Sequence, residues 1–129
     1  MNTIESTAPA PTFHPAINDG EAYAGLARDP ITGQWRHLYA RIEPIAPRTF
    51  NGHIKAATEG GYEVAAIHEL AIIRANCPEF KDLEEWVWSS TPFAGDERYA
   101  WMQGFYNGYQ NGNHKDYDYV AVAVRREPV

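Results

Sequence analysis

The chain has 129 residues, 44% of them hydrophobic, and this length provides one domain with one core rather than two independently stable domains. Its formal net charge is −6 at pH 7, and Lys and Arg are not gathered in any one stretch. Nucleic-acid binding needs basic side chains that neutralise phosphates, so the charge argues against DNA, RNA and an anionic membrane surface as partners. The single cysteine, Cys77, excludes an intrachain disulfide and favours a reducing compartment.

Residues 1–19 are predicted to form an extended N-terminal arm, and residues 20–129 the folded domain. Three prolines lie in this arm among small and polar residues, without an apolar period. Two interpretations stay open: a disordered leader, or an arm that docks on a neighbouring subunit of a homo-oligomer. Glu5 and the lack of an apolar segment argue against a signal peptide, and no apolar stretch is long enough to span a membrane.

A β-hairpin followed by two short helices is expected next. Strands are predicted over Glu21–Arg28 and Gln34–Ile42, and helices over Asn51–Glu59 and Ile67–Asn76. A Pro- and Gly-containing turn joins the strands, Thr49 or Asn51 can cap the first helix, and two glycines can end it. The second helix is expected to face the core with Leu70, Ala71 and Ile73.

The last third of the chain is rich in aromatic residues and alternates with the period of a β-strand. Strands are predicted over residues 99–105, 109–114 and 119–126, with turn signals at Asn107-Gly108 and Asn111-Gly112. In the last strand, three valines should face one way and Ala121, Ala123 and Arg125 the other. We expect Arg125 to pair with an acid or with backbone carbonyls, since a lone buried guanidinium is very unfavourable. A core of Trp88, Trp101 and Phe105 is also expected.

An ordered set of short motifs spans this region. The motifs are Glu85–Thr91, Tyr99-Ala100-Trp101, Asn107-Gly108 with Gln110, His114-Lys115-Asp116 and Ala121–Arg126, preceded by Gly20–Leu26. The set resembles a phage and bacterial family of C-type-lectin-like domains of unknown function, which includes the C-terminal domain of the Legionella collagen-like adhesin. It is also similar to the variable domains of diversity-generating retroelements. The resemblance implies an α+β, C-type-lectin-like fold with a small mixed or antiparallel sheet, two short helices and ligand-binding loops.

One departure from the family lies at the start of the second helix. The family usually has Leu-Pro-Thr there, with Thr as the N-cap, whereas this chain has Val64-Ala65-Ala66 before Ile67. Loss of the hydroxyl cap and of the rigid proline should cost about 1 kcal/mol at that helix end.

Neither a metal site nor an active site is predicted. The five histidines are scattered, without the short spacing of a zinc site. Asp96, Glu97, Asp116 and Asp118 could supply oxygen ligands to calcium, but no lectin calcium motif is present and loop acids commonly face water. One cysteine cannot supply the copper chemistry of the formylglycine-generating enzymes that share the related fold, and no hydrolase triad or phosphate loop stands out. The chain is therefore expected to be non-enzymatic and to need no cofactor.

A binding surface is instead predicted over residues 93–118. Tyrosine offers a large contact area with little rotamer entropy to lose, and asparagine offers adaptable hydrogen bonds. The candidate residues are Phe93, Asp96, Glu97, Tyr106, Asn107, Tyr109, Asn111, Asn113, His114, Tyr117 and Asp118. The expected partner is a protein or a glycan. Two settings remain open: a virion component that contacts capsid or tail proteins, or a small phage protein in the host cytoplasm that inhibits a host defence protein.

Overall fold

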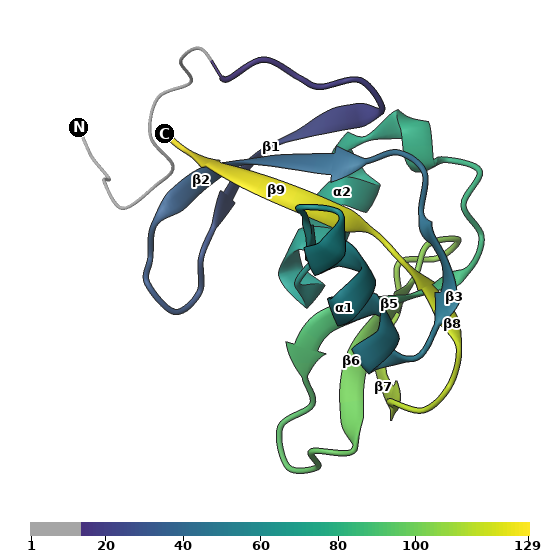
Figure 1. Cartoon of the computed structure of the whole chain (residues 1–129). Coiled ribbons are helices and arrows are strands. Elements are labelled where there is room, and N and C mark those ends of the chain that lie inside the picture. The colour runs from purple at the N-terminus through teal and green to yellow at the C-terminus, as the bar shows by residue number, and fades with distance from the viewer. Residues whose placement is uncertain (1–13) are drawn as a thin grey trace.

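The computed structural model describes residues 14–129, which form two β-sheets and two α-helices (Figure 1). The strands are β1 (Glu21–Arg28), β2 (Trp35–Arg41), β3 (Ile45–Arg48), β4 (Glu63–Val64), β5 (Trp86–Pro92), β6 (Tyr99–Gly104), β7 (Gln110–His114), β8 (Tyr119–Ala121) and β9 (Ala123–Pro128). The helices are α1 (Phe50–Glu59) and α2 (Ile67–Asn76), with a short 3-10 turn, η1 (Pro78–Phe80). One sheet has the order β1-β2-β9-β4 and the other β3-β8-β5-β6-β7. The predicted α+β class is confirmed.

The β1–β2 hairpin and both helices lie where the sequence predicts them. The Asp29 carboxylate closes the hairpin turn by accepting hydrogen bonds from the backbone N–H groups of Ile31 and Thr32, at 2.8 and 3.2 Å. Thr49 caps α1 through the Gly52 N–H, and α2 has the predicted bounds. These features depend on neighbours in the chain, which explains why the sequence alone locates them.

The inward face of α2 differs from the prediction at one position. Leu70 and Ile73 are fully buried as expected, but Ala71 is exposed and Glu69 is buried in its place. Residues three and four apart share a helix face, so Glu69 and Leu70 both face inward with Ile73, while Ala71 lies about 100° further round.

Two other residues replace the N-cap that α2 lacks. The Glu69 carboxylate accepts a hydrogen bond from the Ala66 N–H at 2.8 Å. The Thr91 hydroxyl, at the end of β5, accepts one from the Ile67 N–H at 2.9 Å. The helix start is therefore satisfied, and its hydroxyl comes from a residue 24 positions along the chain rather than from the cap position.

The predicted strand over residues 119–126 is in fact two strands in different sheets. β8 pairs with β3 and β5, and β9 pairs with β2 and β4, with the change of sheet at Val122. The predicted division of faces is confirmed: Val120, Val122 and Val124 belong to one apolar core, and Ala121 to the other.

The interior is divided into two cores, which corrects the expected tryptophan cluster. The α2 core includes Phe105 with Leu38, Leu70 and Val87, and the α1 core includes Trp88 with Phe50, Met102 and Ala121. Trp88 is fully buried and Phe105 nearly so, but they lie on opposite faces of the β5–β6 pair. Trp101 is only half-buried and packs on the Phe93 ring, with 4.8 Å between the ring centroids. Both faces of the sheet are covered, so period-two alternation does not identify a single core face.

Candidate functional site

The last part of the expected arm lies against the domain. The Tyr39 hydroxyl donates to the Pro15 carbonyl at 2.7 Å, and Arg125 Nη2 donates to the Ala16 carbonyl at 2.9 Å. The His14 ring stacks on Tyr23 with 4.0 Å between centroids. Residues 14–18 therefore cover the outer face of the β1–β2 hairpin and β9. Residues 1–13 of the expected arm lie outside the described residues.

Arg125 is paired as the sequence predicts. Its guanidinium makes two hydrogen bonds to the Glu21 carboxylate, at 2.8 and 2.9 Å, and lies 3.9 Å from the centroid of the Tyr39 ring. Burial raises the pKa of Glu21, but hydrogen bonds from Arg125, the Tyr62 hydroxyl and the Asn18 N–H outweigh it and lower this pKa to about 2. The next residue, Arg126, is equally covered and pairs with the buried Glu69.

Acid should weaken the fold through Glu21. Its pKa falls from 4.5 to about 2 on folding, so the stability that it provides is present above pH 4.5 and is lost as the pH falls towards 2. The shift corresponds to about 3 kcal/mol. Urea unfolding from about pH 6 down to about pH 2 should show this loss, and Glu21→Gln should be less stable near neutrality but less dependent on pH over that window. Equal pH slopes in the two proteins would contradict this role.

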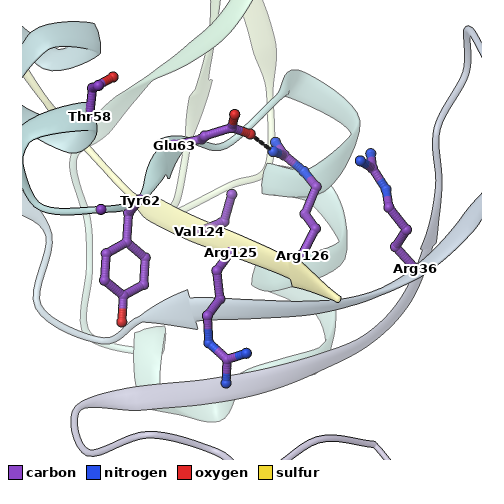
Figure 2. Close-up of a pocket in the computed structure, with 8 residues that line it drawn as sticks. Arg36, Thr58, Tyr62, Glu63, Val124, Arg125 and Arg126 are labelled. Carbon is purple, nitrogen blue, oxygen red and sulfur yellow. Dashed lines mark hydrogen bonds and ion pairs between the residues drawn. The ribbon is translucent and has the colours of Figure 1, made fainter. Parts of the chain in front are cut away.

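A hollow of about 470 Å³ lies over β9 beside β4 (Figure 2). Its lining includes Arg36, Arg125 and Arg126, which together suggest an anion site. Each of these arginines already binds a carboxylate, however: Arg36 binds Asp29 at 3.2 Å, and the other two bind the buried acids described above. The arginines of this hollow therefore stabilise the folded domain through ion pairs.

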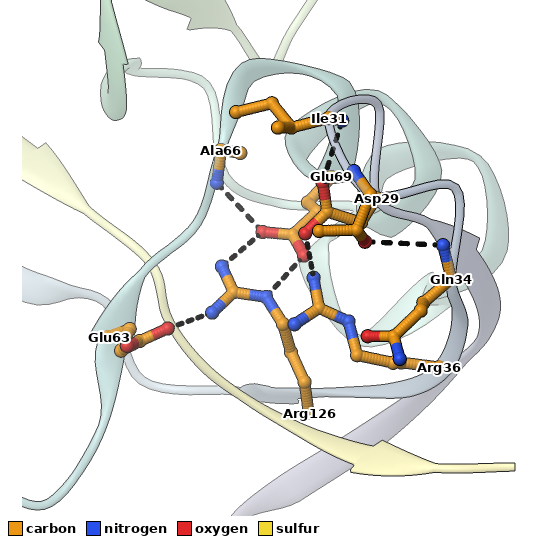
Figure 3. A network of polar contacts seen from close by, with 9 residues as sticks. Asp29, Ile31, Gln34, Arg36, Glu63, Ala66, Glu69 and Arg126 are labelled. Atoms are coloured by element: carbon orange, nitrogen blue, oxygen red, sulfur yellow. Dashed lines mark hydrogen bonds and ion pairs between the residues drawn. The ribbon is translucent and has the colours of Figure 1, made fainter.

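A larger groove of about 590 Å³ runs between the β1–β2 turn, the start of α2 and the end of β5. Figure 3 shows its charged floor, in which Arg126 bridges Glu69 and Glu63 and the Glu69 carboxylate also reaches the Ala66 N–H. Arg126 makes two hydrogen bonds to Glu69, at 2.6 and 2.7 Å. This network joins β9 to α2, so its first role is to hold the helix on the sheet.

The predicted binding residues lie in three separate places rather than on one surface. Tyr106, Asn107 and Tyr109 form the turn between β6 and β7. Asn111 and Asn113 lie along β7. The remaining six start from the opposite end of β6 and β7: Phe93, Asp96, Glu97, His114, Tyr117 and Asp118. Of these, the Phe93 ring reaches back over Trp101 and Gly112 in the middle of the two strands. β6 has six residues, so about 20 Å separates the two ends at a rise of about 3.3 Å per residue.

The asparagines of β7 serve the edge of the sheet. Asn111 Oδ1 accepts a hydrogen bond from the Gly112 N–H at 2.9 Å, and Asn113 Oδ1 accepts one from the His114 N–H at 2.8 Å. Side-chain oxygens thus satisfy N–H groups on an edge strand, which reduces the tendency of that edge to pair with another chain. The predicted turn at Asn111-Gly112 is wrong, since both residues lie within β7. The glycine is required instead by the Phe93 ring, because an added Cβ would lie 2.3 Å from Phe93 Cδ2.

Asp96, at the far end of β6, is held by contacts within its own loop. Asp96 accepts hydrogen bonds from the side chain and the backbone N–H of Arg98, at 2.9 to 3.1 Å, and these lower its pKa to about 2. Across residues 14–129, no three His, Cys, Asp or Glu side chains come together as a metal site would need. The candidate calcium ligand Asp96 therefore already has a cationic partner.

The turn between β6 and β7 is the candidate site with the best-defined geometry, and we call Tyr106–Tyr109 the tip. Arg74 of α2 donates to the Phe105 carbonyl at 2.8 Å and to the Tyr106 carbonyl at 3.3 Å. Asn107 Oδ1 accepts a hydrogen bond from the Tyr109 N–H, and Gly108 has a φ of 79°. The side chains of Tyr106 and Tyr109 project from this braced turn and are 60% and 69% exposed.

Arg74 supports the tip from outside it, and the sequence alone does not indicate this role. It lies 31 positions before Phe105, whose carbonyl it binds. In the sequence it looks like any other charged residue near the end of a helix. An added Cβ on Gly108 would lie 3.0 Å from Arg74 Nη1, so the glycine allows the guanidinium to lie against the turn. The tip is therefore held by a contact from a distant element.

No protein-family model matches the chain, and no curated protein matches it significantly. The structure supports the family resemblance at the level of a small α+β domain with two sheets and two helices. No helix within residues 14–129 is long and apolar enough to cross a membrane.

Proposed function

We propose that this protein is a non-enzymatic binding protein that recognises a protein or glycan partner through the tip. The observation that supports the proposal is the combination of two well-exposed tyrosines with a backbone that is already braced by Arg74 and Asn107. A turn that is ordered before binding loses little conformational entropy on association, and tyrosine side chains lose less than most large ones. The two together favour recognition over a purely structural role.

The other residues of the predicted surface are not proposed to contact the partner together with the tip. Asn111 and Asn113 satisfy the β7 edge, and the residues at the opposite end of the strands are too distant to share a small ligand with the tip. Tyr117, which is 57% exposed at that end, provides a natural comparison for the tip tyrosines.

We further propose a phage or prophage setting, on the strength of the motif resemblance. In one version, the protein is an oligomeric virion component that contacts capsid or tail proteins. In the alternative, it acts in the host cytoplasm and inhibits a host protein. Purified virions separate the two: the first predicts that the protein remains with the particles through a density gradient, and the second that it does not.

The double variant Tyr106→Ser, Tyr109→Ser should fold normally and bind poorly. Both side chains project into solvent, so the melting temperature should stay within a few degrees, while the affinity should fall by about thirtyfold or more, the usual scale of two aromatic contacts. Thermal melts and a quantitative assay on virions or on a purified partner measure the two effects. Tyr117→Ser is the matched control and should leave the affinity unchanged. An early melt of the double variant would show that the tyrosines serve the fold, and unchanged binding would place the site elsewhere.

A further inference from the structure

An acidic segment runs from within η1 to the start of β5, and we define it as residues 79–85. It contains four exposed carboxylates and one lysine: Glu79, Asp82, Glu84, Glu85 and Lys81. The apolar residues of the same stretch point the other way, with Phe80 buried in the α2 core and Leu83 packed against it. The fold therefore presents the charged side of this segment outward.

The acidic segment lies directly beside the tip. The Glu85 carbonyl accepts a hydrogen bond from the Phe105 N–H at 3.0 Å, one residue before Tyr106. Trp86 pairs with Gly104 in the β5–β6 ladder, and the rings of Phe80 and Phe105 lie 6.0 Å apart between centroids. These contacts place exposed carboxylates and exposed tyrosines on adjoining parts of one surface.

The carboxylates of the acidic segment have no cationic partner within the described part of the chain, a property that they share with Glu43 and Glu59 but not with the acids that pair with arginine. Asp29, Glu63, Asp96 and Glu127 each lie within 4 Å of an arginine. Within residues 14–129, no such ion pair involves an acid of residues 79–85. The cations nearby are Lys81 and Arg74, and the Arg74 guanidinium donates to the carbonyls of the tip. The surface keeps an excess of negative charge.

We propose that the tip and the acidic segment together form a docking surface for a protein partner whose contact region is rich in Lys and Arg. This inference rests on the proposed binding role of the tip and adds the chemistry of the partner. Lysine and arginine can lie over the faces of the two tyrosines through cation–π contacts while they pair with the neighbouring carboxylates. Charge complementarity of this kind raises the association rate and makes it sensitive to salt.

The test uses the full chain and an array of short synthetic peptides of fixed length, in which Lys, Arg, Asp, Glu and Leu vary. Bound peptides should be enriched in Lys and Arg, and one of them then serves as the probe for association kinetics at low and at physiological salt. The triple variant Asp82→Asn, Glu84→Gln, Glu85→Gln should lower the association rate at low salt by about tenfold. A triple variant of three exposed acids elsewhere, Asp19→Asn, Glu43→Gln, Glu59→Gln, makes the same change in net charge and should have little effect.

The outcomes separate this inference from the proposed function. If the control triple weakens binding as much as the segment triple, overall charge is responsible and the basic-partner surface is refuted. If bound peptides show no enrichment in Lys and Arg and the segment triple is inert, while Tyr106→Ser, Tyr109→Ser abolishes binding, the tip keeps its role and the partner chemistry is refuted. If the tyrosine double variant binds the probe as before, the tip is not the contact for basic peptides and this inference fails, while the assay on virions or on a purified partner decides the proposed function separately. Thermal melts of all variants exclude unfolding as the cause.

Discussion

Trp88→Ala should remove most of the stability of the domain. The side chain is fully buried in the α1 core, edge-on to Phe50 at 6.0 Å and to Tyr119 at 5.7 Å between centroids. Its indole N–H donates to the Tyr117 carbonyl at 3.2 Å. Truncation removes a large apolar surface, leaves a cavity and leaves the Tyr117 carbonyl without its hydrogen-bond donor. The free energy of unfolding should fall by about 3–5 kcal/mol. A small domain has a free energy of unfolding of about 5–15 kcal/mol, so the variant should be partly unfolded near physiological temperature.

Trp101→Ala is the matched control for this prediction. It removes the same side chain from β6, but Trp101 is only half-buried and packs mainly on Phe93, so it should cost clearly less than the Trp88 variant. Urea unfolding of both variants at one pH measures the two losses. Equal losses would show that the two faces of β5 and β6 are not covered as the structure has them.

Arg126→Ala should have an effect of similar size through a different mechanism. The Glu69 side chain is 1% exposed, and Arg126 is its ion-pair partner, with two hydrogen bonds. Burial raises the pKa of Glu69, but the hydrogen bonds and charge of Arg126 and the Ala66 N–H lower it below its usual value. Removal of the guanidinium leaves the Glu69 carboxylate buried, with the Ala66 N–H as its remaining donor. This unpaired buried charge should lower the free energy of unfolding by about 3–5 kcal/mol.

Two further variants identify the cause. Glu63→Gln removes the exposed member of the network, whose side chain is 71% exposed, and should change stability by less than about 1 kcal/mol. Arg126→Met combined with Glu69→Met removes both charges and should recover most of the loss, apart from the contribution of Glu69 to the start of α2. The loss caused by Arg126→Ala should also shrink at low pH, where Glu69 becomes protonated and its burial is tolerated. A loss that is independent of pH would indicate missing packing rather than an unpaired charge.

Some features of the proposed binding surface could be predicted from the sequence and others could not. The exposure of Tyr106 and Tyr109 follows from their place around Asn107-Gly108, since a short turn between two strands projects its side chains outward. The separation of Asn111 and Asn113 from this tip could not be foreseen. A glycine that permits a turn and a glycine that accommodates the Phe93 ring look alike in the sequence, and only the register of β6 and β7 distinguishes them.

Local patterns in the sequence by themselves determined the β1–β2 hairpin, both helices with their ends, the alternation of valine and alanine in residues 120–124 and the pairing requirement of Arg125. These depend on hydrogen bonds and periodicities within a few residues. Only the tertiary structure decided the change of sheet at Val122, the opposite faces of Trp88 and Phe105, and the contacts of Arg74 and Arg126 with partners 31 and 57 positions away. The reason is physical: period two assigns side chains to faces, but which element covers each face depends on contacts between distant segments.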